Sequence, residues 1–419
     1  MTIHKSAASC ADEYDPSAKT VDQALSYIEQ YISPVTDTLS RPLTALYGFV
    51  LAEDIHSSIN VPAYTNSAMD GYALRSEDIS ADSNTCLQLV GKAFAGVPFE
   101  GALENGQCIR IMTGAVIPDG ADCVVMQEHV QTGEKDTDII VPPGQSAGQN
   151  IRHAGEDVRQ DETVFYRGHL IKPADVGVLA ALGIAEAKVY RSLRVAVLST
   201  GDELKQPGQQ LEPGQLYDSN RYSLTALLHQ PNIELRDFGI IPDQAELIRS
   251  AMLDAASWAD VVITSGGVSV GEADYVRQTL EQIGKVNFWK IAMKPGRPLA
   301  YGKIGQAEFF GLPGNPVSAM ATFVQFIRPA LSLKSGSGMQ TSLSLRLQTV
   351  SRLKKRPGRV EYQRGIIFTN ELGQSVVKTT GGQGSHILSS MSKANCFIVL
   401  PLESAGADTG DWVEVQLFS

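Results

Sequence analysis

Apolar residues recur along this 419-residue chain with two different periods, and the period changes several times. Between residues 20 and 32 they return every three or four positions, which predicts an amphipathic helix that begins after Thr20 and ends before Pro34. Gln23 stands three positions after Thr20, which is the spacing of a capping box. The first predicted element is therefore a helix with one face packed against another element.

Between about residue 58 and residue 150 the apolar positions form short β-branched runs instead. Three such runs, at 108–112, 123–127 and 138–141, are separated by Gly, Pro, Asp and Asn. Runs of this length with such breaks are typical of strands joined by turns. This part is predicted to be a small β-rich unit that ends at the Pro- and Gly-containing turn 142–144.

Strand-like and helical patterns alternate between residues 193 and 333. The predicted strands are 193–198, 233–241 and 261–264, and the predicted helices are 219–229, 244–259, 275–283 and 316–331. Such alternation indicates βαβ units and a mainly parallel sheet. After about residue 334 short strands return without a convincing helix, so a small β-barrel or sandwich is expected there. The fold class predicted for the whole chain is multidomain, α+β and α/β.

The composition narrows the possible functions. Acidic side chains outnumber basic ones by 46 to 35, a net charge of −11, so no general basic excess exists to neutralise nucleic-acid phosphates. The five cysteines contain no CxxC pair, which argues against a zinc knuckle or a disulfide framework. The first 19 residues hold no apolar run typical of a signal peptide, and no run is long enough to span a bilayer. We expect a cytoplasmic protein with no nucleic-acid or membrane partner.

Candidate chemistry lies where predicted parallel strands end, because ligands of such sheets bind at that edge. The strand 193–198 leads into Thr200, Gly201, Asp202 and Glu203, which offer a hydroxyl, a tight turn and two carboxylates. The same acids would also suit a helix N-terminus, where they favour the helix dipole. Both interpretations stay open for this segment taken alone.

The strand 261–264 leads into a longer glycine- and serine-rich loop. Its candidate anion-binding residues, which offer backbone N–H groups or hydroxyls, are Ser265, Gly266, Gly267 and Ser269. Glu272 and Asp274 follow and could hold a divalent cation next to the anion. A glycine-rich loop by itself is a weak signal, but this one comes one βα unit after a similar acid-bearing loop.

Basic residues form two clusters in this acidic chain. If residues 290–294 are extended, Lys290 and Lys294 lie on one face and can converge on one anion, although an exposed basic turn is the alternative. Pro313, Gly314 and Asn315 then form a rigid turn before the last predicted helix of this part. The second cluster comprises Arg352, Lys354, Lys355, Arg356, Arg359 and Arg364. It could attract an anion, or it could be a solvated hairpin.

Two further segments, 62–73 and 150–157, would each pass for an ordinary loop if taken alone. No GxSxG elbow, Walker loop, HExxH or strand-associated GxGxxG is present. Ser385 and His386 are adjacent, so they cannot face one another as nucleophile and base. His153 has no His or Cys partner nearby and is better explained as a structural residue.

Taken together, these segments resemble the MoeA family of molybdopterin molybdenumtransferases, which also includes the E domain of gephyrin. The matching stretches follow the family's order and are 66–73 (NSAMDGYA), 110–115 (RIMTGA), 150–157, 199–204 (STGDEL), 265–275 (SGGVSVGEADY), 294–298 and 312–318 (LPGNPVS). They cover the chain from about residue 20 to its end. Arg297, where the family often has Lys, is a mild departure.

The resemblance implies insertion of molybdenum from molybdate into adenylylated molybdopterin, with Mg²⁺-dependent cleavage of the adenylate to give molybdenum cofactor and AMP. It implies a homodimer, with molybdopterin adenylyltransferase and molybdoenzyme maturation proteins as candidate partners. It also implies four domains: an elongated, dimerising domain I (14–57 and 152–190), a β-rich insertion as domain II (58–151), a molybdopterin-binding α/β domain III (191–333) and a β-barrel domain IV (334–419).

The family's functional residues carry over to matching positions of this chain. The implied catalytic residues are Asp70, Thr113, Asp157, Glu203, Asp243, Asp274, Lys290 and Lys294, with Glu203 and Asp274 as metal ligands. Arg359 and Ser385 match the family's molybdate-contacting residues, and the strand-end loops supply the other candidate substrate-binding residues, which are Thr200, Ser265, Gly266, Gly267, Ser269, Pro313, Gly314 and Asn315. Three alternatives remain: an adenylyltransferase that makes adenylylated molybdopterin, a scaffold like the gephyrin E domain, and an enzyme specialised for tungstate.

Overall fold

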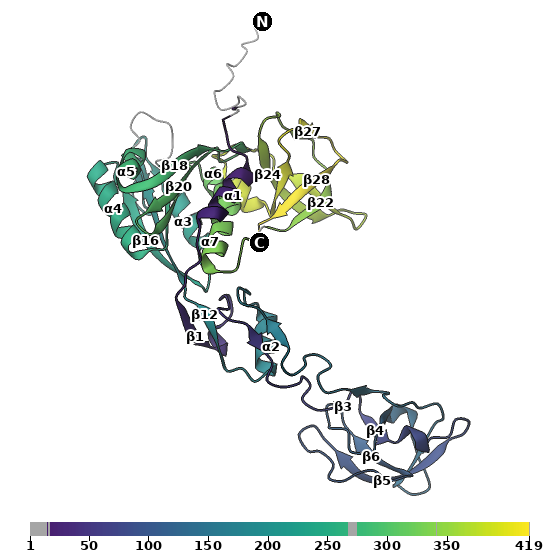
Figure 1. Cartoon of the computed structure of the whole chain (residues 1–419). Helices are drawn as coiled ribbons and strands as arrows, with labels where there is room; N and C mark the ends of the chain where they lie inside the picture. Colours follow the sequence, from purple (N-terminus) through teal and green to yellow (C-terminus); the bar gives the residue numbers. More distant parts are fainter. Residues whose placement is uncertain (1–14, 16, 267–274, 341, 419) are drawn as a thin grey trace. The chain divides into compact units, whose positions relative to one another are not determined.

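The structure is a computed structural model that describes residues 15, 17–266, 275–340 and 342–418. The chain divides into two compact units. The first comprises Met1–Ser40, Tyr47–Ala52 and Lys188–Ser419, and the second comprises Arg41–Leu46 and Glu53–Ala187. Strands β1 (Thr38–Pro42) and β12 (Glu186–Tyr190) contribute residues to both. Figure 1 shows the helices and strands of the chain, coloured along the sequence.

A six-stranded sheet forms the centre of the first unit, in the order β16-β13-β17-β21-β20-β18. Its strands are β16 (Ile233–Ile241), β13 (Leu193–Thr200), β17 (Val261–Ser265), β21 (Ala307–Leu312), β20 (Pro298–Ile304) and β18 (Gly284–Lys290). The first four are parallel, and β20 and β18 extend the sheet through antiparallel pairs. The predicted mainly parallel sheet is therefore confirmed.

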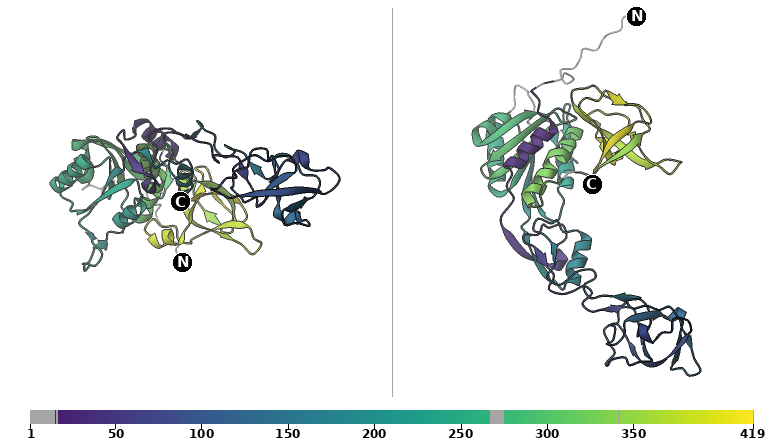
Figure 2. Two further views of the ribbon diagram at one scale, coloured as in Figure 1. Left: turned by 90° about the horizontal axis from the view of Figure 1, so that it is seen from below. Right: turned by 45° about the vertical axis from the view of Figure 1, so that its right-hand side comes forward.

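Helices cover both faces of this sheet, as its nearly continuous apolar central strands require. On one face, α4 (Ala245–Trp258) and α5 (Tyr275–Ile283) bury Ile248, Met252 and Leu280 against side chains of β13, β17 and β21. The other helices of the unit are α1 (Val21–Tyr31), α3 (Ser219–Leu227), α6 (Pro316–Thr322) and α7 (Arg328–Ser335). Figures 1 and 2 show α1 beside α7, and α1 carries the predicted capping box of Thr20 and Gln23.

A closed β-barrel follows the α/β part. Its five strands pair in the ring β24-β25-β22-β28-β26 and back to β24. They are β24 (Val360–Thr369), β25 (Ser375–Thr379), β22 (Ser344–Thr349), β28 (Trp412–Leu417) and β26 (Cys396–Leu400). The short strand β19 (Met293–Lys294) pairs with β24, and β23 (Leu353–Lys354) pairs with β27 (Gly406–Ala407). The predicted C-terminal barrel is present.

The second unit is built on another six-stranded sheet, in the order β7-β4-β6-β5-β9-β8. These strands are β7 (Cys123–Met126), β4 (Gly71–Leu74), β6 (Gln107–Ile111), β5 (Thr85–Ala93), β9 (Asp138–Val141) and β8 (Gln131–Thr132). The unit also contains β2 (Ile55–His56), β3 (Asn66–Ser67), β10 (Ile151–Arg152), β11 (Thr163–Phe165) and α2 (Pro173–Ala181). The pairs β10–β3 and β11–β2 bring segments 84 to 110 residues apart in sequence side by side.

Two helical predictions needed correction. The single helix predicted at 316–331 is instead α6, a π-helical segment (Phe323–Ile327) and α7. Pro329 lacks the N–H that a continuous α-helix would need at that position, which accounts for the irregular turn before it. The barrel also contains a short helix, α8 (Leu388–Lys393), whose polar sequence gives no apolar period. Among the described residues, no helix combines the length and apolarity needed to cross a bilayer.

Candidate active site

Four strands of the α/β sheet end along one edge, and the strand ends with the turns that follow them carry eight of the predicted site residues. The register pairs Ser199 with Ser265 and Ser265 with Leu312, and β13 also pairs Thr200 with Ile241. The turns after these strands therefore lie next to one another. This alignment of strand ends brings together the predicted residues Thr200, Glu203, Asp243, Ser265, Gly266, Pro313, Gly314 and Asn315.

The turn after β17 approaches the end of β13 closely. The Gly266 N–H donates to the Leu312 carbonyl oxygen at 3.1 Å. Gly266 has φ +95°, and a Cβ there would lie 2.9 Å from the Thr200 carbonyl oxygen, so only glycine fits. The Thr200 side chain is buried, and its hydroxyl has no hydrogen-bond partner among the described residues. An unsatisfied hydroxyl beside a glycine turn is suited to receive a polar group of a ligand.

Carboxylates crowd the same edge. The Glu203 side chain folds over Gly201, where a Cβ would lie 2.6 Å from Glu203 Oε2. The Asp243 N–H donates to Asp202 Oδ1 at 3.0 Å. Burial, together with the negative charges of Asp202 and Glu203, raises the pKa of Asp243. We refer to Asp202, Glu203 and Asp243 as the acidic edge.

The chemistry of the acidic edge fits a hard divalent cation, because such ions prefer carboxylate oxygens and would relieve the repulsion among the three acids. In the described part of the chain, no three His, Cys, Asp or Glu side chains lie close enough to hold an ion alone. Mg²⁺ commonly binds through one or two carboxylates, water and substrate phosphates. Glu203 is placed to supply one ligand, and the predicted ligand Asp274 lies outside the described residues, as do Gly267 and Ser269.

The predicted lysines are held by different acids. Lys290 Nζ donates to Asp15 Oδ2 at 3.2 Å, and Arg297 Nη2 donates to the same oxygen at 3.0 Å. Lys294 Nζ instead donates to Glu361 Oε1 at 3.1 Å. The two lysines stand in different surroundings, because Lys290 ends a strand of the α/β sheet whereas Lys294 pairs with the barrel strand β24, and their convergence on one anion stays a prediction.

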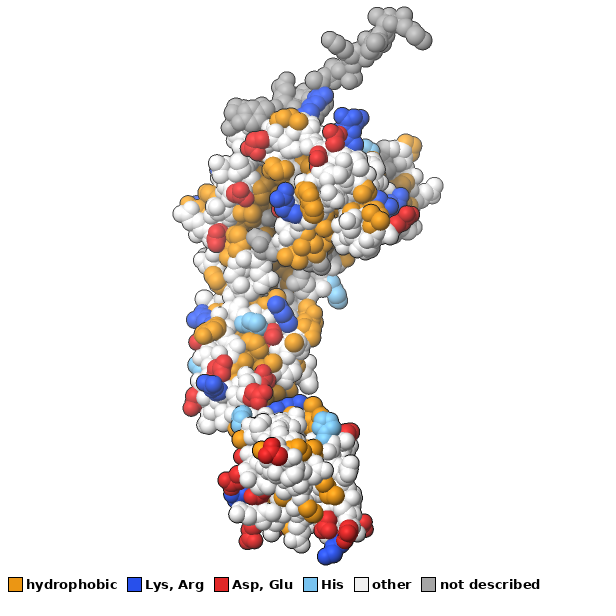
Figure 3. Space-filling view, turned by 90° about the vertical axis from the view of Figure 1, so that its right-hand side faces the viewer, with side chains coloured by type: hydrophobic (Ala, Val, Ile, Leu, Met, Phe, Trp, Pro, Cys, Tyr) orange, Lys and Arg blue, Asp and Glu red, His pale blue; other side chains and the backbone are white. Residues whose placement is uncertain are grey.

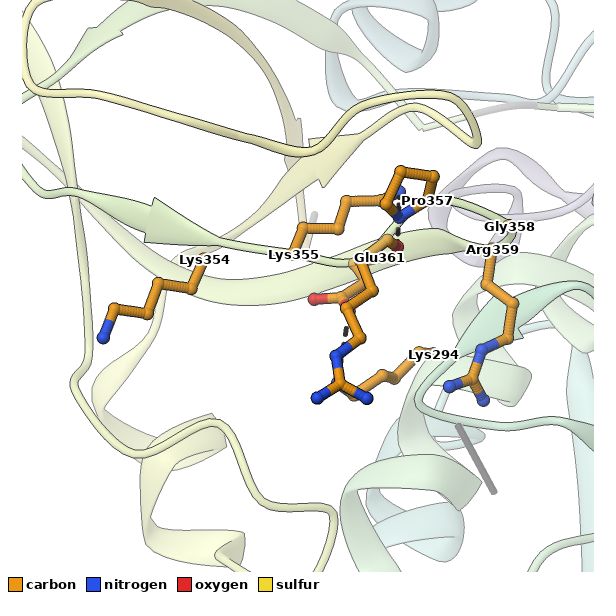
Figure 4. A pocket seen from close by; sticks show the side chains of 8 residues that line it. Lys294, Lys354, Lys355, Pro357, Gly358, Arg359 and Glu361 are labelled. Atoms are coloured by element: carbon orange, nitrogen blue, oxygen red, sulfur yellow. Dashed lines mark hydrogen bonds and ion pairs between the residues drawn. The ribbon is translucent and has the colours of Figure 1, made fainter. Parts of the chain in front are cut away.

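A basic cavity of about 420 Å³ lies beside the barrel (Figure 4). We define it by its lining residues, which are Lys294, Lys354, Lys355, Arg356, Pro357, Gly358, Arg359 and Glu361. In Figure 4, Lys294 lies near Glu361, Arg359 stands apart from them on the right, and Lys354 extends to the left. The ammonium of Lys355 is buried and donates to the carbonyl oxygens of Arg356, Leu402 and Ser404 at 2.8–3.2 Å. These bonds hold the backbone segments beside the cavity together.

Arg364 was assigned to a basic surface cluster by sequence, but the structure buries it in the barrel. Only 1% of Arg364 is exposed, and its Nη2 donates to the Gly384 carbonyl oxygen at 3.1 Å. Its Nε donates to Ser390 Oγ at 3.0 Å. The loop thus fixed carries Ser385, whose carbonyl oxygen accepts the Val317 N–H at 3.1 Å. The available sequence signal was that Arg364 stands just before the apolar residues Ile366–Phe368 of the same strand.

The remaining predicted residues belong to the second unit. The Thr113 N–H and hydroxyl both donate to Asp70 Oδ1 at 2.7 Å, and these two bonds lower the pKa of Asp70. Asp157 lines an open, mostly acidic cavity of about 610 Å³ together with Gly155, Glu156, Arg159, Gln160, Asp161 and Glu162. The structure therefore joins Asp70 to Thr113 and gives Asp157 a separate setting.

The first unit thus combines turns suited to anions, crowded carboxylates and a basic cavity, features that suit an enzyme for small anionic substrates. Three family models match the chain: "MoeA N-terminal region (domain I and II)" at 19–183, "Probable molybdopterin binding domain" at 196–333 and "MoeA C-terminal region (domain IV)" at 346–418. The chain belongs to the MoeA family of molybdopterin molybdenumtransferases and is a transferase.

Known relatives match the chain over nearly its whole length. It is 45% identical to a molybdopterin molybdenumtransferase of Haemophilus influenzae, over 96% of this chain and 98% of the relative. It is 33% identical to one from Nostoc sp., over 96% of this chain and 94% of the relative. A crystal structure of the molybdopterin biosynthesis MoeA protein from Pyrococcus horikoshii matches with a TM-score of 0.82 and 29% identity, covering 96% of this chain and 100% of that one.

Proposed function

We propose that this protein inserts molybdenum from molybdate into adenylylated molybdopterin and cleaves the adenylate in a Mg²⁺-dependent step, giving molybdenum cofactor and AMP. The observation that carries the proposal is the presence of two oppositely charged sites in one unit, the acidic edge and the basic cavity. A substrate with a phosphate link and a second, oxyanionic substrate need both kinds of site. The names of the relatives support the transfer of molybdenum to molybdopterin.

Each group of residues has a stated role in this proposal. The Ser265 hydroxyl and the 313–315 turn, which the Gly266–Leu312 backbone bond holds beside one another, bind the pterin substrate and its phosphates. Bound Mg²⁺ would supply charge neutralisation between the carboxylates and the phosphate oxygens. Lys294 and Arg359 hold molybdate, and Ser385 lies on the loop that Arg364 fixes. The phosphate link breaks, with an oxygen of molybdate or water as the attacking group.

The state and setting of the protein belong to the same proposal. We infer a homodimer in the cytoplasm in which Asp70 and Asp157 complete the site of the other subunit. Molybdopterin adenylyltransferase and molybdoenzyme maturation proteins are the proposed partners. On the face drawn in Figure 3, the Lys and Arg side chains of the described residues are scattered among Asp and Glu. This distribution agrees with the proposed absence of a nucleic-acid partner.

One assay tests the reaction and its alternatives. Purified protein is mixed with adenylylated molybdopterin, Mg²⁺ and either molybdate or tungstate, and AMP and metal-loaded pterin are measured. We expect both products with molybdate and none after Mg²⁺ is removed with EDTA. Products with tungstate alone would indicate a tungstate enzyme, and consumption of ATP with free molybdopterin would indicate an adenylyltransferase. Release with neither oxyanion would contradict the proposal and favour a scaffold.

A further inference from the structure

Asn220 lies in the first turn of α3, directly behind the edge of the sheet where the candidate substrate turns meet. The Asp218 side chain caps this helix by accepting the Arg221 N–H at 3.2 Å. Arg221 Nε also donates to Asp218 Oδ2 at 2.9 Å, and its Nη1 pairs with Asp237 on β16. The start of α3 is therefore tied to the sheet, and Asn220, only 8% exposed, has a fixed position.

The amide of Asn220 bridges two turns that follow neighbouring strands. Its Nδ2 donates to Ser265 Oγ, at the end of β17, at 2.8 Å. The same nitrogen donates to the Gly314 carbonyl oxygen, in the turn after β21, at 2.7 Å. A primary amide has two N–H donors on one nitrogen, and both are used here. Ser or Thr offers one donor and Asp offers none, so the bridge depends on the amide.

The bridge also determines what the Ser265 hydroxyl can do. Because Ser265 Oγ accepts a hydrogen bond from Asn220, its own proton is available to donate to a third group. Ser265 is 3% exposed, and the next residue, Gly266, is bonded to Leu312 at the start of the second turn. The two turns are thus held together by one backbone bond and by the two bonds from Asn220.

We propose that Asn220 is a positioning residue that fixes the spacing of the Ser265–Gly266 and Pro313–Asn315 turns and directs the Ser265 hydroxyl toward a phosphoryl oxygen of the substrate. This inference rests on the proposed function, because that function assigns the two turns to the adenylylated pterin. Asn220 acts through Ser265 and Gly314 and makes no contact with the reacting atoms. Its loss loosens binding of the phosphate-linked substrate and leaves the oxyanion cavity unchanged.

The kinetic test uses Asn220→Ala and the nearly isosteric Asn220→Asp. Leaving buried acceptors without a donor raises the KM for adenylylated molybdopterin about tenfold in each variant, with little change in the molybdate dependence. Asn395 offers a matched control, because its amide also bridges backbone groups, with bonds of 2.8 and 3.0 Å to Ile367 in the barrel. Asn395→Ala should leave that KM within twofold of wild type. An unchanged KM in both Asn220 variants overturns the inference.

A double-mutant cycle separates positioning from general destabilisation. Ser265→Ala removes the hydroxyl without touching α3, so the effects of Asn220→Ala and Ser265→Ala on KM should be strongly non-additive. Additive effects would show that Asn220 does not act through Ser265, and would overturn the inference. If Asn220→Ala folds poorly, Asn220→Asp takes its place in the cycle and is combined with Ser265→Ala in the same way.

A measurement without substrate keeps this test independent of the proposed function. Hydrogen exchange of the Gly266 amide reports the bond that joins the two turns. Its exchange should be about tenfold faster in Asn220→Ala than in wild type and unchanged in Asn395→Ala. If wild type releases no AMP, the proposed function fails, and this exchange still decides the structural claim. Equal exchange in wild type and Asn220→Ala overturns it.

Discussion

The acidic edge and the basic cavity belong to the same unit but handle charge in opposite ways. At the acidic edge, burial and then the negative charges of Asp202 and Glu203 raise the pKa of Asp243, so the carboxylates there repel one another. In the basic cavity, cations gather around a single acid, and Glu361 is already bonded to Lys294. The first region gathers negative charges that a bound cation would neutralise, whereas the second keeps its positive charge partly compensated by its own carboxylate.

This difference explains how a chain with a net charge of −11 can suit anionic substrates. The excess of acids includes a group at the ends of parallel strands, where a divalent ion can bridge them to phosphate. The bases are few, but a turn of the barrel collects several of them around one cavity. The net charge of the chain governs the long-range attraction of ligands, whereas the charges that line a site govern which ligand binds there.

Among the substitutions that test the contrast between the acidic edge and the basic cavity, Lys294→Ala should have the largest effect. Removing Lys294 takes a cation from the basic cavity and leaves Glu361, of which only 7% is exposed, without that partner. The affinity for molybdate should fall about thirtyfold or more, as measured by isothermal titration calorimetry. Lys378→Ala, which alters a lysine that lies over Phe368, is the control and should bind molybdate as wild type does. Equal affinity in Lys294→Ala and wild type would remove Lys294 from the oxyanion site.

The second prediction concerns Glu361, whose neutralisation should strengthen the binding of molybdate, whereas loss of Lys294 should weaken it. Glu361→Gln keeps the shape of the side chain and removes the negative charge that holds Lys294 and accepts a bond from Gln363 at 3.0 Å. Molybdate should then bind about three- to tenfold more tightly, because it no longer competes with a carboxylate for Lys294. Glu371→Gln, at an exposed turn, should change nothing. Weaker binding in Glu361→Gln would mean that Glu361 serves to position Lys294.

Much of the acidic edge was predictable, because it follows from periodicity and a topological rule. Apolar runs identified β13, β16 and β17, and the rule that ligands bind at the carboxyl ends of parallel strands pointed to Thr200 and Ser265. Asp243 was predicted only from the family resemblance, because a single acidic residue after a strand forms no recognisable sequence pattern. The structure then showed why it belongs there, through its bond to Asp202.

The basic cavity was predictable as a charge cluster but not as a site. Arg359 and Arg364 look alike in sequence, yet one lines the cavity and the other is buried behind the Ser385 loop. Arg359 lies before the first residue of β24 and Arg364 lies inside that strand, so their difference depends on where the strand begins and on the closure of the barrel, which are set by long-range pairing. Asn220 was missed for the same reason, because its two acceptors are 45 and 94 residues away.

A smaller effect should appear when the acidic edge alone is altered. Asp243→Asn removes one carboxylate near Glu203, so the Mg²⁺ concentration for half-maximal AMP release should rise about threefold, with unchanged affinity for molybdate. AMP release is followed over a Mg²⁺ titration, with Asp254→Asn on the exposed side of α4 as control. An equal loss of molybdate affinity would show that the two regions do not work separately.

The smallest effect concerns stability without metal. Because the pKa of Asp243 is raised in the folded protein, this group stabilises the fold below the ordinary Asp value of about 3.9. That stabilisation is lost as the pH rises through the folded-state pKa, so at neutral pH the wild-type carboxylate opposes folding.

Asp243→Asn should therefore melt about 1 °C above wild type at pH 7 in EDTA, and the difference should vanish below about pH 4. Added Mg²⁺ should reverse the order at pH 7, because it stabilises the intact acidic edge more than the variant. If the variant melts below wild type in EDTA, repulsion among these carboxylates does not govern the region, and its contrast with the basic cavity fails.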